Sequence, residues 1–137
     1  HMDIIVTPHL GEMARLTGDS VSFIQSKLID SATDFANKYN VICVLKDFRT
    51  ITALPYSSVF INLSGNPGMA SAGSGDVLSG IIGGLLAQGV VSEKAAGLGV
   101  YIHGLAGDEA MRQKGSYSMM ADDIIDGLSH VMCTISG

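Results

Sequence analysis

The sequence contains little charge, few prolines and no tryptophan. Charged residues make up 15% of its 137 residues, and the net charge is −5 at pH 7. A chain with this acidic balance is not built to neutralise nucleic-acid phosphates or an anionic membrane, so we expect neither as a partner. The longest apolar run, around residues 77–87, is interrupted by glycines and is too short to cross a bilayer. Hydrophobic residues make up 47%, which is enough for the core of one domain.

Cysteine usage is equally sparse. Cys43 and Cys133 lie far apart and form neither a CxxC pair nor a zinc-ligand spacing. Because both lie in apolar stretches, we expect two buried, reduced thiols in a cytoplasmic protein. The sequence also lacks an HExxH motif and a Cys/His cluster, so we expect no directly ligated metal. His103 and His130 fall within helical patterns and are interpreted as core or surface residues.

The order of the expected elements is that of an α/β domain. Ile4–Val6 predicts a short strand that ends at Thr7-Pro8. Apolar residues at helical spacing predict one amphipathic helix from Val21 to Tyr39, capped by Asp19 or Ser20. Strands are expected next over residues 41–45, 50–54 and 58–62, and helices then over 93–112 and 119–135, the second capped by Ser118.

A further helix is expected to begin at Asp76 and to stop at Gly89. Its apolar residues cover most of the circumference, which predicts a buried helix. Gly80, Gly83 and Gly84 each reduce helix propensity, by about 1 kcal/mol. We interpret these glycines as sites of close packing against a neighbour or a ligand.

The glycine-rich loop from Ser64 to Gly75 is the most informative segment. Its small residues let backbone N–H groups converge, and the helix that follows adds the positive end of its dipole, so the loop suits a phosphate. It is not a Walker A loop, because Ser74-Gly75 stands where Lys-Ser/Thr is needed after Gly73. It is not a dinucleotide fingerprint either, because Leu78 stands where that motif needs glycine or alanine.

Asp76 follows this loop at the start of the helix. A carboxylate beside a phosphoryl-transfer site is a natural acceptor for the proton of a substrate hydroxyl. An aspartate in this place is equally often a helix cap. The residues by themselves leave both interpretations open.

The segment Asn62–Ile82, with Gly-Asn-Pro-Gly-Met-Ala and Gly-Ser-Gly-Asp, resembles the signature of the ADP/ATP-dependent NAD(P)H-hydrate dehydratases. That family belongs to the ribokinase-like superfamily. The resemblance implies an α/β, ribokinase-like fold, here the C-terminal half of a three-layer sandwich with a central sheet and flanking helices. It also implies that Asp76 is the catalytic base and contacts substrate, and that Gly73, Ser74 and Gly75 form the phosphate loop.

Two other segments agree with this family. Thr7–Gly18 is similar to its Thr-Pro-His-x-Gly-Glu segment, which implies that His9 contacts the substrate and that Glu12 lies near Mg²⁺. The segment 44–50 resembles its Lys-Gly-x-x-Thr segment, which implies that the nucleotide is bound by Lys46, Asp47, Phe48, Arg49 and Thr50, together with Gly75. Asp47 departs from the pattern, since glycine is common there. Tyr117–Ile125 resembles the family's closing helix and is interpreted as structural.

The reaction implied by the resemblance restores NADH or NADPH from its hydrate (NADHX or NADPHX) at the expense of ADP or ATP, with Mg²⁺. Two alternatives stay open: a small-molecule kinase of the same superfamily, and a nucleotide-binding assembly module without turnover. Family domains are longer and begin with further βα units. We therefore expect residues 3–137 to form a part of such a domain that associates with an N-terminal segment or with itself. His1-Met2 is interpreted as a vector remnant.

Overall fold

The structure is a computed structural model that describes residues 3–115 and 117–136. The chain separates into two compact units, each with its own packing. Unit 1 contains residues 3–62 and 91–97, and unit 2 contains the described residues of 63–90 and 98–136. Of the boundaries between the units, the one after Gly97 falls within a long helix, and each unit is described by itself.

Unit 1 is built on a four-stranded mixed sheet in the order β1-β2-β3-β4. The short strand β1 pairs in parallel with β2, and the two pairings that follow are antiparallel. All four residues of β2 and all three of β3 are buried, as expected for central strands. The bounds are β1 Ile5–Val6, β2 Ile42–Leu45, β3 Ile51–Ala53 and β4 Val59–Ile61.

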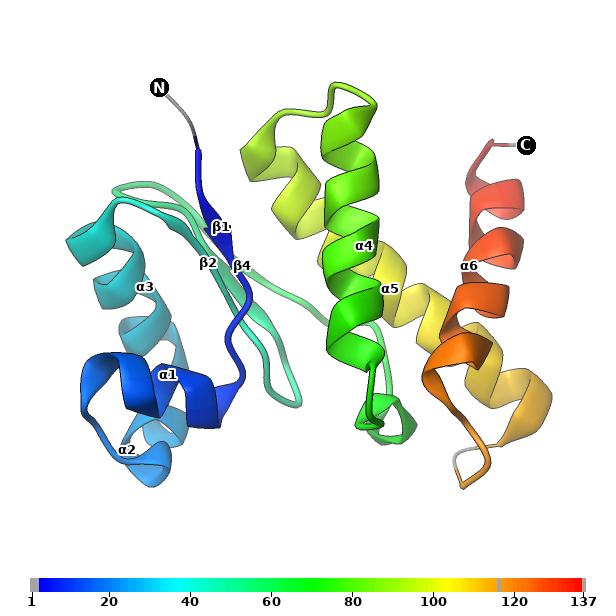
Figure 1. Cartoon of the computed structure of the whole chain (residues 1–137), viewed down its shortest axis with the longest axis horizontal. Helices are drawn as coiled ribbons and strands as arrows, with labels where there is room; N and C mark the ends of the chain where they lie inside the picture. The colour runs from blue at the N-terminus through cyan, green and yellow to red at the C-terminus, as the bar shows by residue number, and fades with distance from the viewer. Residues whose placement is uncertain (1–2, 116, 137) are drawn as a thin grey trace. The chain divides into compact units, whose positions relative to one another are not determined.

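Three helices, α1 Leu10–Thr17, α2 Val21–Ser26 and α3 Leu28–Tyr39, pack on one face of this sheet (Figure 1). Their apolar residues meet inward-facing residues of β2 and β3 in one core. The core residues are Met13, Ile24, Ala32, Phe35, Ala36, Val41, Cys43, Leu45, Ile51 and Ala53.

The expected single helix from Val21 to Tyr39 is wrong, because the helix is broken at Lys27. Lys27 leaves the helical region with φ −135° and ψ 49°, and the hydroxyl of Ser26 donates to the carbonyl of Phe23 at 2.7 Å. A serine side chain that bonds a nearby carbonyl competes with the helical backbone ladder. Of the two expected caps, Ser20 is the N-cap, and its hydroxyl accepts from the N–H of Phe23 at 3.1 Å.

Unit 2 is helical. The 3-10 turn η1 Pro67–Met69 leads to α4 Ser74–Ala87, which is followed by α5 Ser92–Lys114 and α6 Ala121–Ser136. Helix α5 packs closely against α4 at Gly99 and against α6 at Ala106 (Figure 1). Helix α6 begins after Met120, whose N–H donates to the Asp123 carboxylate at 2.8 Å, so the expected cap at Ser118 is wrong.

Helix α4 differs from its prediction in two ways. It begins at Ser74 rather than Asp76, because Gly73 adopts a left-handed conformation (φ 88°) and acts as N-cap. Its burial is confined to one side, and a Cβ at Gly80, Gly83 or Gly84 would meet nothing within 4 Å. The expected close packing at these three glycines is therefore not found. Gly89 follows the helix with φ 85°, as predicted.

The two cysteines differ in their exposure to solvent. Both are free thiols, but Cys43 is buried in unit 1 whereas Cys133 is exposed on α6, which corrects the expectation that both are buried. Burial raises the pKa of the Cys43 thiol to about 12. Among the described residues, no helix is long and apolar enough to span a membrane.

Candidate functional site

The candidate site residues of unit 1 gather at the carboxyl ends of β1 and β2. Parallel pairing continues past the strands as a bridge between His9 and Lys46, where the N–H of Lys46 donates to the carbonyl of Pro8 at 2.8 Å. This pairing places His9, Glu12 and Lys46 at one edge of the sheet. The carboxyl ends of parallel strands are where open α/β sheets bind ligands.

His9 and Glu12 form a reciprocal cap at the start of α1. The N–H of Glu12 donates to Nδ1 of His9 at 3.1 Å, and the N–H of His9 donates to Oε2 of Glu12 at 2.8 Å. The hydrogen bond from the His9 backbone, with lesser help from the positive charges of Lys46 and Arg15, lowers the pKa of Glu12. Glu12 is therefore an anion at neutral pH, held beside an exposed imidazole.

Residues 46–50 form the turn between β2 and β3, since Leu45 pairs with Ile51. The turn carries Lys46, Asp47, Phe48 and Arg49 one after another, and Phe48 is 74% exposed. Thr50 ends the turn, and its carbonyl accepts from the N–H of Asn62 at 3.0 Å. An exposed ring beside two cations suits a ligand with a planar group and phosphates.

A pocket of about 460 Å³ lies beside this edge within unit 1. Its polar part comes from Thr7, Glu12 and Arg15, and its apolar part from β1 and α1. The residues that line it are Val6, Thr7, Pro8, Glu12, Arg15 and Leu16.

In unit 2 the glycine-rich loop turns into α4 at Gly73. The N–H of Ser74 is already used, since it donates to the carbonyl of Ser71 at 3.2 Å. The amides of Gly73 and Gly75 make no hydrogen bond to a carbonyl of the described chain, which leaves them for a ligand. The hydroxyl of Ser71, also in the loop, is buried without a partner among the described residues. The loop therefore offers donors next to the positive end of the α4 dipole.

Asp76 lies in the first turn of α4 and is exposed. It is not the N-cap, which is Gly73, and within the described residues its carboxylate accepts no hydrogen bond. The interpretation of Asp76 as a helix cap is therefore wrong. An exposed carboxylate beside the loop is available to a substrate hydroxyl.

The structure thus brings His9, Glu12 and Lys46 together in unit 1, and Gly73, Gly75 and Asp76 together in unit 2. Sequence reasoning missed two residues that contact the loop, namely His103 and Asp108 of α5. Nε2 of His103 lies 3.0 Å from the carbonyl of Ser74, and the Asp108 carboxylate accepts from the N–H of Gly65 at 2.9 Å. The available signal was helical spacing, since His103 and Gly107, like Gly104 and Asp108, are four residues apart and so are neighbours on the surface of α5.

The chain is similar to several proteins of known sequence. A family described as NAD(P)H-hydrate dehydratase matches residues 1–130. The bifunctional NAD(P)H-hydrate repair enzyme of Moorella thermoacetica is 50% identical over 132 residues, which are 96% of this chain and 25% of that protein. The ADP-dependent (S)-NAD(P)H-hydrate dehydratase of Neisseria meningitidis serogroup B is 42% identical over 113 residues, which are 82% of this chain and 38% of that protein.

Solved structures agree with these matches. The ADP/ATP-dependent NAD(P)H-hydrate dehydratase of Bacillus subtilis, co-crystallized with ATP/Mg²⁺, has a TM-score of 0.92 at 31% identity, over 96% of this chain and 48% of that chain. A ribokinase-like superfamily protein of Enterococcus faecalis has a TM-score of 0.76 at 34% identity, over 93% of this chain and 43% of that chain. The expected ribokinase-like fold is confirmed, and the chain spans a quarter to a half of the length of these proteins.

Proposed function

We propose, since this chain belongs to the NAD(P)H-hydrate dehydratase family, that it supplies part of the active site of an enzyme that restores hydrated NADH or NADPH. The observation that carries the proposal is the exposed carboxylate of Asp76, next to a loop whose Gly73 and Gly75 amides are not used by the described chain. Donors for a phosphoryl group and an acceptor for a proton then lie on one helix end.

In the proposed reaction the hydroxyl of the hydrated nicotinamide is first phosphorylated. Asp76 accepts the proton of this hydroxyl while the hydroxyl oxygen forms a bond to the terminal phosphorus of the nucleotide. AMP leaves if the nucleotide is ADP, and ADP leaves if it is ATP. Phosphate is then eliminated with a proton from the neighbouring ring carbon, which restores the double bond. The Gly73 and Gly75 amides stabilise charge on the transferring group.

We assign nucleotide binding to Lys46, Asp47, Phe48, Arg49, Thr50 and Gly75, and substrate binding to His9 and Asp76. Mg²⁺ would neutralise phosphate charge when bound. The described residues contain no cluster of three metal-ligating side chains, so the phosphates and water would supply most of its ligands. Glu12 would act through such a water, because its oxygens already cap α1.

We also propose that unit 1 associates with a further segment or a second copy. β1 pairs with only β2 among the described strands, and Ile4 beside it is 54% exposed. An open strand edge is a template for pairing. The free thiols of Cys43 and Cys133 support a cytoplasmic location.

The test is recovery of reduced-nicotinamide absorbance when the chain is incubated with NADHX, Mg²⁺ and either ADP or ATP. Asp76→Asn should abolish turnover and leave nucleotide affinity, measured by calorimetry, nearly unchanged. Asp122→Asn is the matched control, since Asp122 is an exposed aspartate in the first turn of α6. Full turnover by Asp76→Asn would remove Asp76 from the reaction, and a stable phosphorylated alcohol would identify a kinase instead.

A further inference from the structure

Helix α5 holds the start of the glycine-rich loop through Asp108. Its Oδ2 accepts from the N–H of Gly65 at 2.9 Å, and its Oδ1 accepts from the side-chain amide of Asn66 at 2.9 Å. Gly65 has φ 95°, a conformation that favours glycine. The carboxylate thus binds a backbone amide and a side chain at the point where the loop begins.

The orientation of the Asn66 amide is fixed from its other side. Oδ1 of Asn66 accepts from the N–H of Gly68 at 3.1 Å, so its NH₂ group must face Asp108. The chain of bonds therefore runs from the carboxylate of Asp108 through Asn66 to the turn η1. A flipped amide would bring two donors together at Gly68.

The end of the loop is held by His103, on the same side of α5. Nε2 of His103 lies 3.0 Å from the carbonyl of Ser74 and 3.3 Å from its hydroxyl. A carbonyl only accepts, so Nε2 carries the proton and donates to the first turn of α4. This is the turn that contains Gly75 and Asp76.

Two glycines between these side chains let the loop lie directly on α5. A Cβ at Gly104 would be 2.0 Å from the Ser64 hydroxyl and 2.8 Å from its backbone carbon, and a Cβ at Gly107 would be 2.2 Å from Sδ of Met69. The side of α5 formed by His103, Gly104, Gly107 and Asp108 is hereafter the loop platform.

We propose that Asp108 and His103 are positioning residues, and that the loop platform sets the geometry in which the loop receives the phosphoryl group. The inference rests on the proposed function for the identity of the ligand. Neither side chain needs to touch the reacting atoms. Their effect is to hold the Gly73 and Gly75 amides in place before the phosphate arrives, which is how preorganised donors stabilise developing charge.

The test exchanges the two members of the Asp108–Asn66 pair. Asp108→Asn places two amide donors face to face, and Asn66→Asp places two carboxylates face to face. The double variant carries both changes and restores every bond, because an aspartate at 66 accepts from Gly68 and from the new amide, while the oxygen of that amide accepts from Gly65.

Two readouts are used. Amide exchange of Gly65 and Gly68, followed by NMR in the absence of nucleotide, should be roughly tenfold faster in each single variant and near the original rate in the double variant. In turnover with ADP or ATP, each single variant should lower kcat roughly tenfold with little change in KM, since the loop acts on the transition state.

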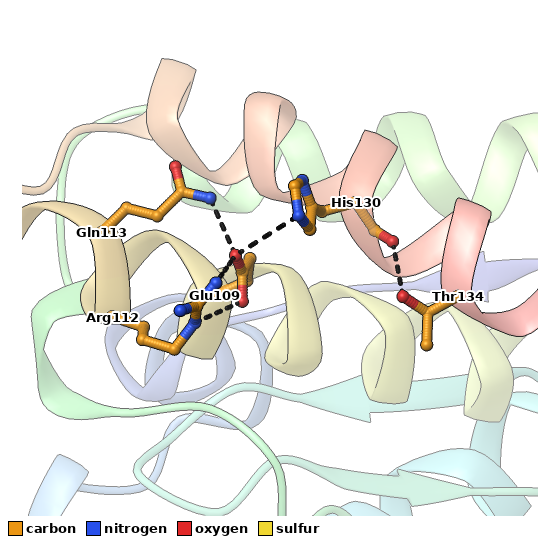
Figure 2. A network of polar contacts seen from close by, with 5 residues as sticks. All are labelled: Glu109, Arg112, Gln113, His130 and Thr134. Atoms are coloured by element: carbon orange, nitrogen blue, oxygen red, sulfur yellow. Dashed lines mark hydrogen bonds and ion pairs between the residues drawn. The ribbon is translucent and has the colours of Figure 1, made fainter.

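Glu109→Gln is the matched control. It makes the same change of carboxylate to amide one residue along α5, where the partners are Arg112, Gln113 and His130 rather than the loop (Figure 2). It should leave both readouts unchanged. The far-ultraviolet circular dichroism of all variants reports whether they fold.

The outcomes separate the two proposals. If the unaltered chain shows no turnover, the result counts against the proposed function. The amide exchange rates of Gly65 and Gly68 in the variants then still test whether Asp108 positions the loop. A double variant no better than the worse single variant would overturn the positioning role, as would single variants that match Glu109→Gln in both readouts. Rescue of exchange together with kcat supports it.

Discussion

A glycine in a helix either allows a neighbouring helix to approach closely or only lowers helix propensity. Two glycines of unit 2 are examples, one of each kind. A Cβ at Gly127 of α6 would lie 2.3 Å from the carbonyl oxygen of Ala106 on α5, whereas ordinary contacts begin near 3.4 Å. A Cβ at Gly80 of α4 would meet nothing within 4 Å. The same substitution, glycine to alanine, should therefore have opposite effects at the two positions.

At Gly80 only helix propensity changes, and alanine should stabilise the chain by about 0.5–1 kcal/mol. At Gly127 the same gain is opposed by the clash, which involves backbone and so cannot be relieved by a rotamer change. The helices must separate by about 1 Å, at a cost of about 2–3 kcal/mol, because packed interiors have little free space. The net loss at Gly127 is then about 1–2.5 kcal/mol.

Thermal unfolding followed by circular dichroism measures both effects. For a chain of this size Tm should rise by roughly 3 °C in Gly80→Ala and fall by roughly 5 °C in Gly127→Ala. An equal or higher Tm in Gly127→Ala would refute the close approach of α6 to α5. A fall in Gly80→Ala as large as that in Gly127→Ala would mean that Gly80 is also packed.

Three further predictions follow from single contacts. Because burial raises the pKa of Cys43 to about 12 and Cys133 is exposed, a thiol reagent should modify one cysteine in the native chain and two in denaturant. Bonds from Arg112, then Gln113, lower the pKa of Glu109 from 4.5 to about 2. The contribution of Glu109 to the free energy of unfolding is present above pH 4.5 and is lost as the pH falls through 2. In Glu109→Gln the free energy of unfolding, measured with denaturant, should therefore decrease less between these two pH values. Ser20→Ala should lower the free energy of unfolding by about 1 kcal/mol through loss of the α2 cap.

Much of unit 1 could be predicted from local pattern. The runs that became β2 to β4 are short, apolar and bounded by turn residues, and their strands lie within the expected ranges. The break at Lys27 could not be predicted, because the apolar spacing continues across it from Ile24 to Leu28 and the break depends on a bond between Ser26 and Phe23. The burial of α4 was also predicted wrongly, since composition alone does not say which neighbours a helix has.

The candidate site likewise contains residues that the sequence could indicate and residues that it could not. Asp76, Lys46 and His9 stand in motifs that are contiguous in sequence, so the sequence could indicate them. Asp108 and His103 act on a loop that begins about 40 residues earlier in the chain, at Gly65, and their relation to it depends on how α5 packs. A spacing on one helix suggests a shared side but not what that side contacts.

The hydrogen bond at the start of α1 also determines which ring nitrogen of His9 carries the hydrogen. Its Nδ1 accepts from the N–H of Glu12, so the neutral ring holds its hydrogen on Nε2. In the proposed function Nε2 is therefore the nitrogen that faces the substrate, as a hydrogen-bond donor, for example to a carboxamide oxygen. The hydrogen bond that begins α1 thus also fixes the ring atom through which the imidazole can donate to a ligand.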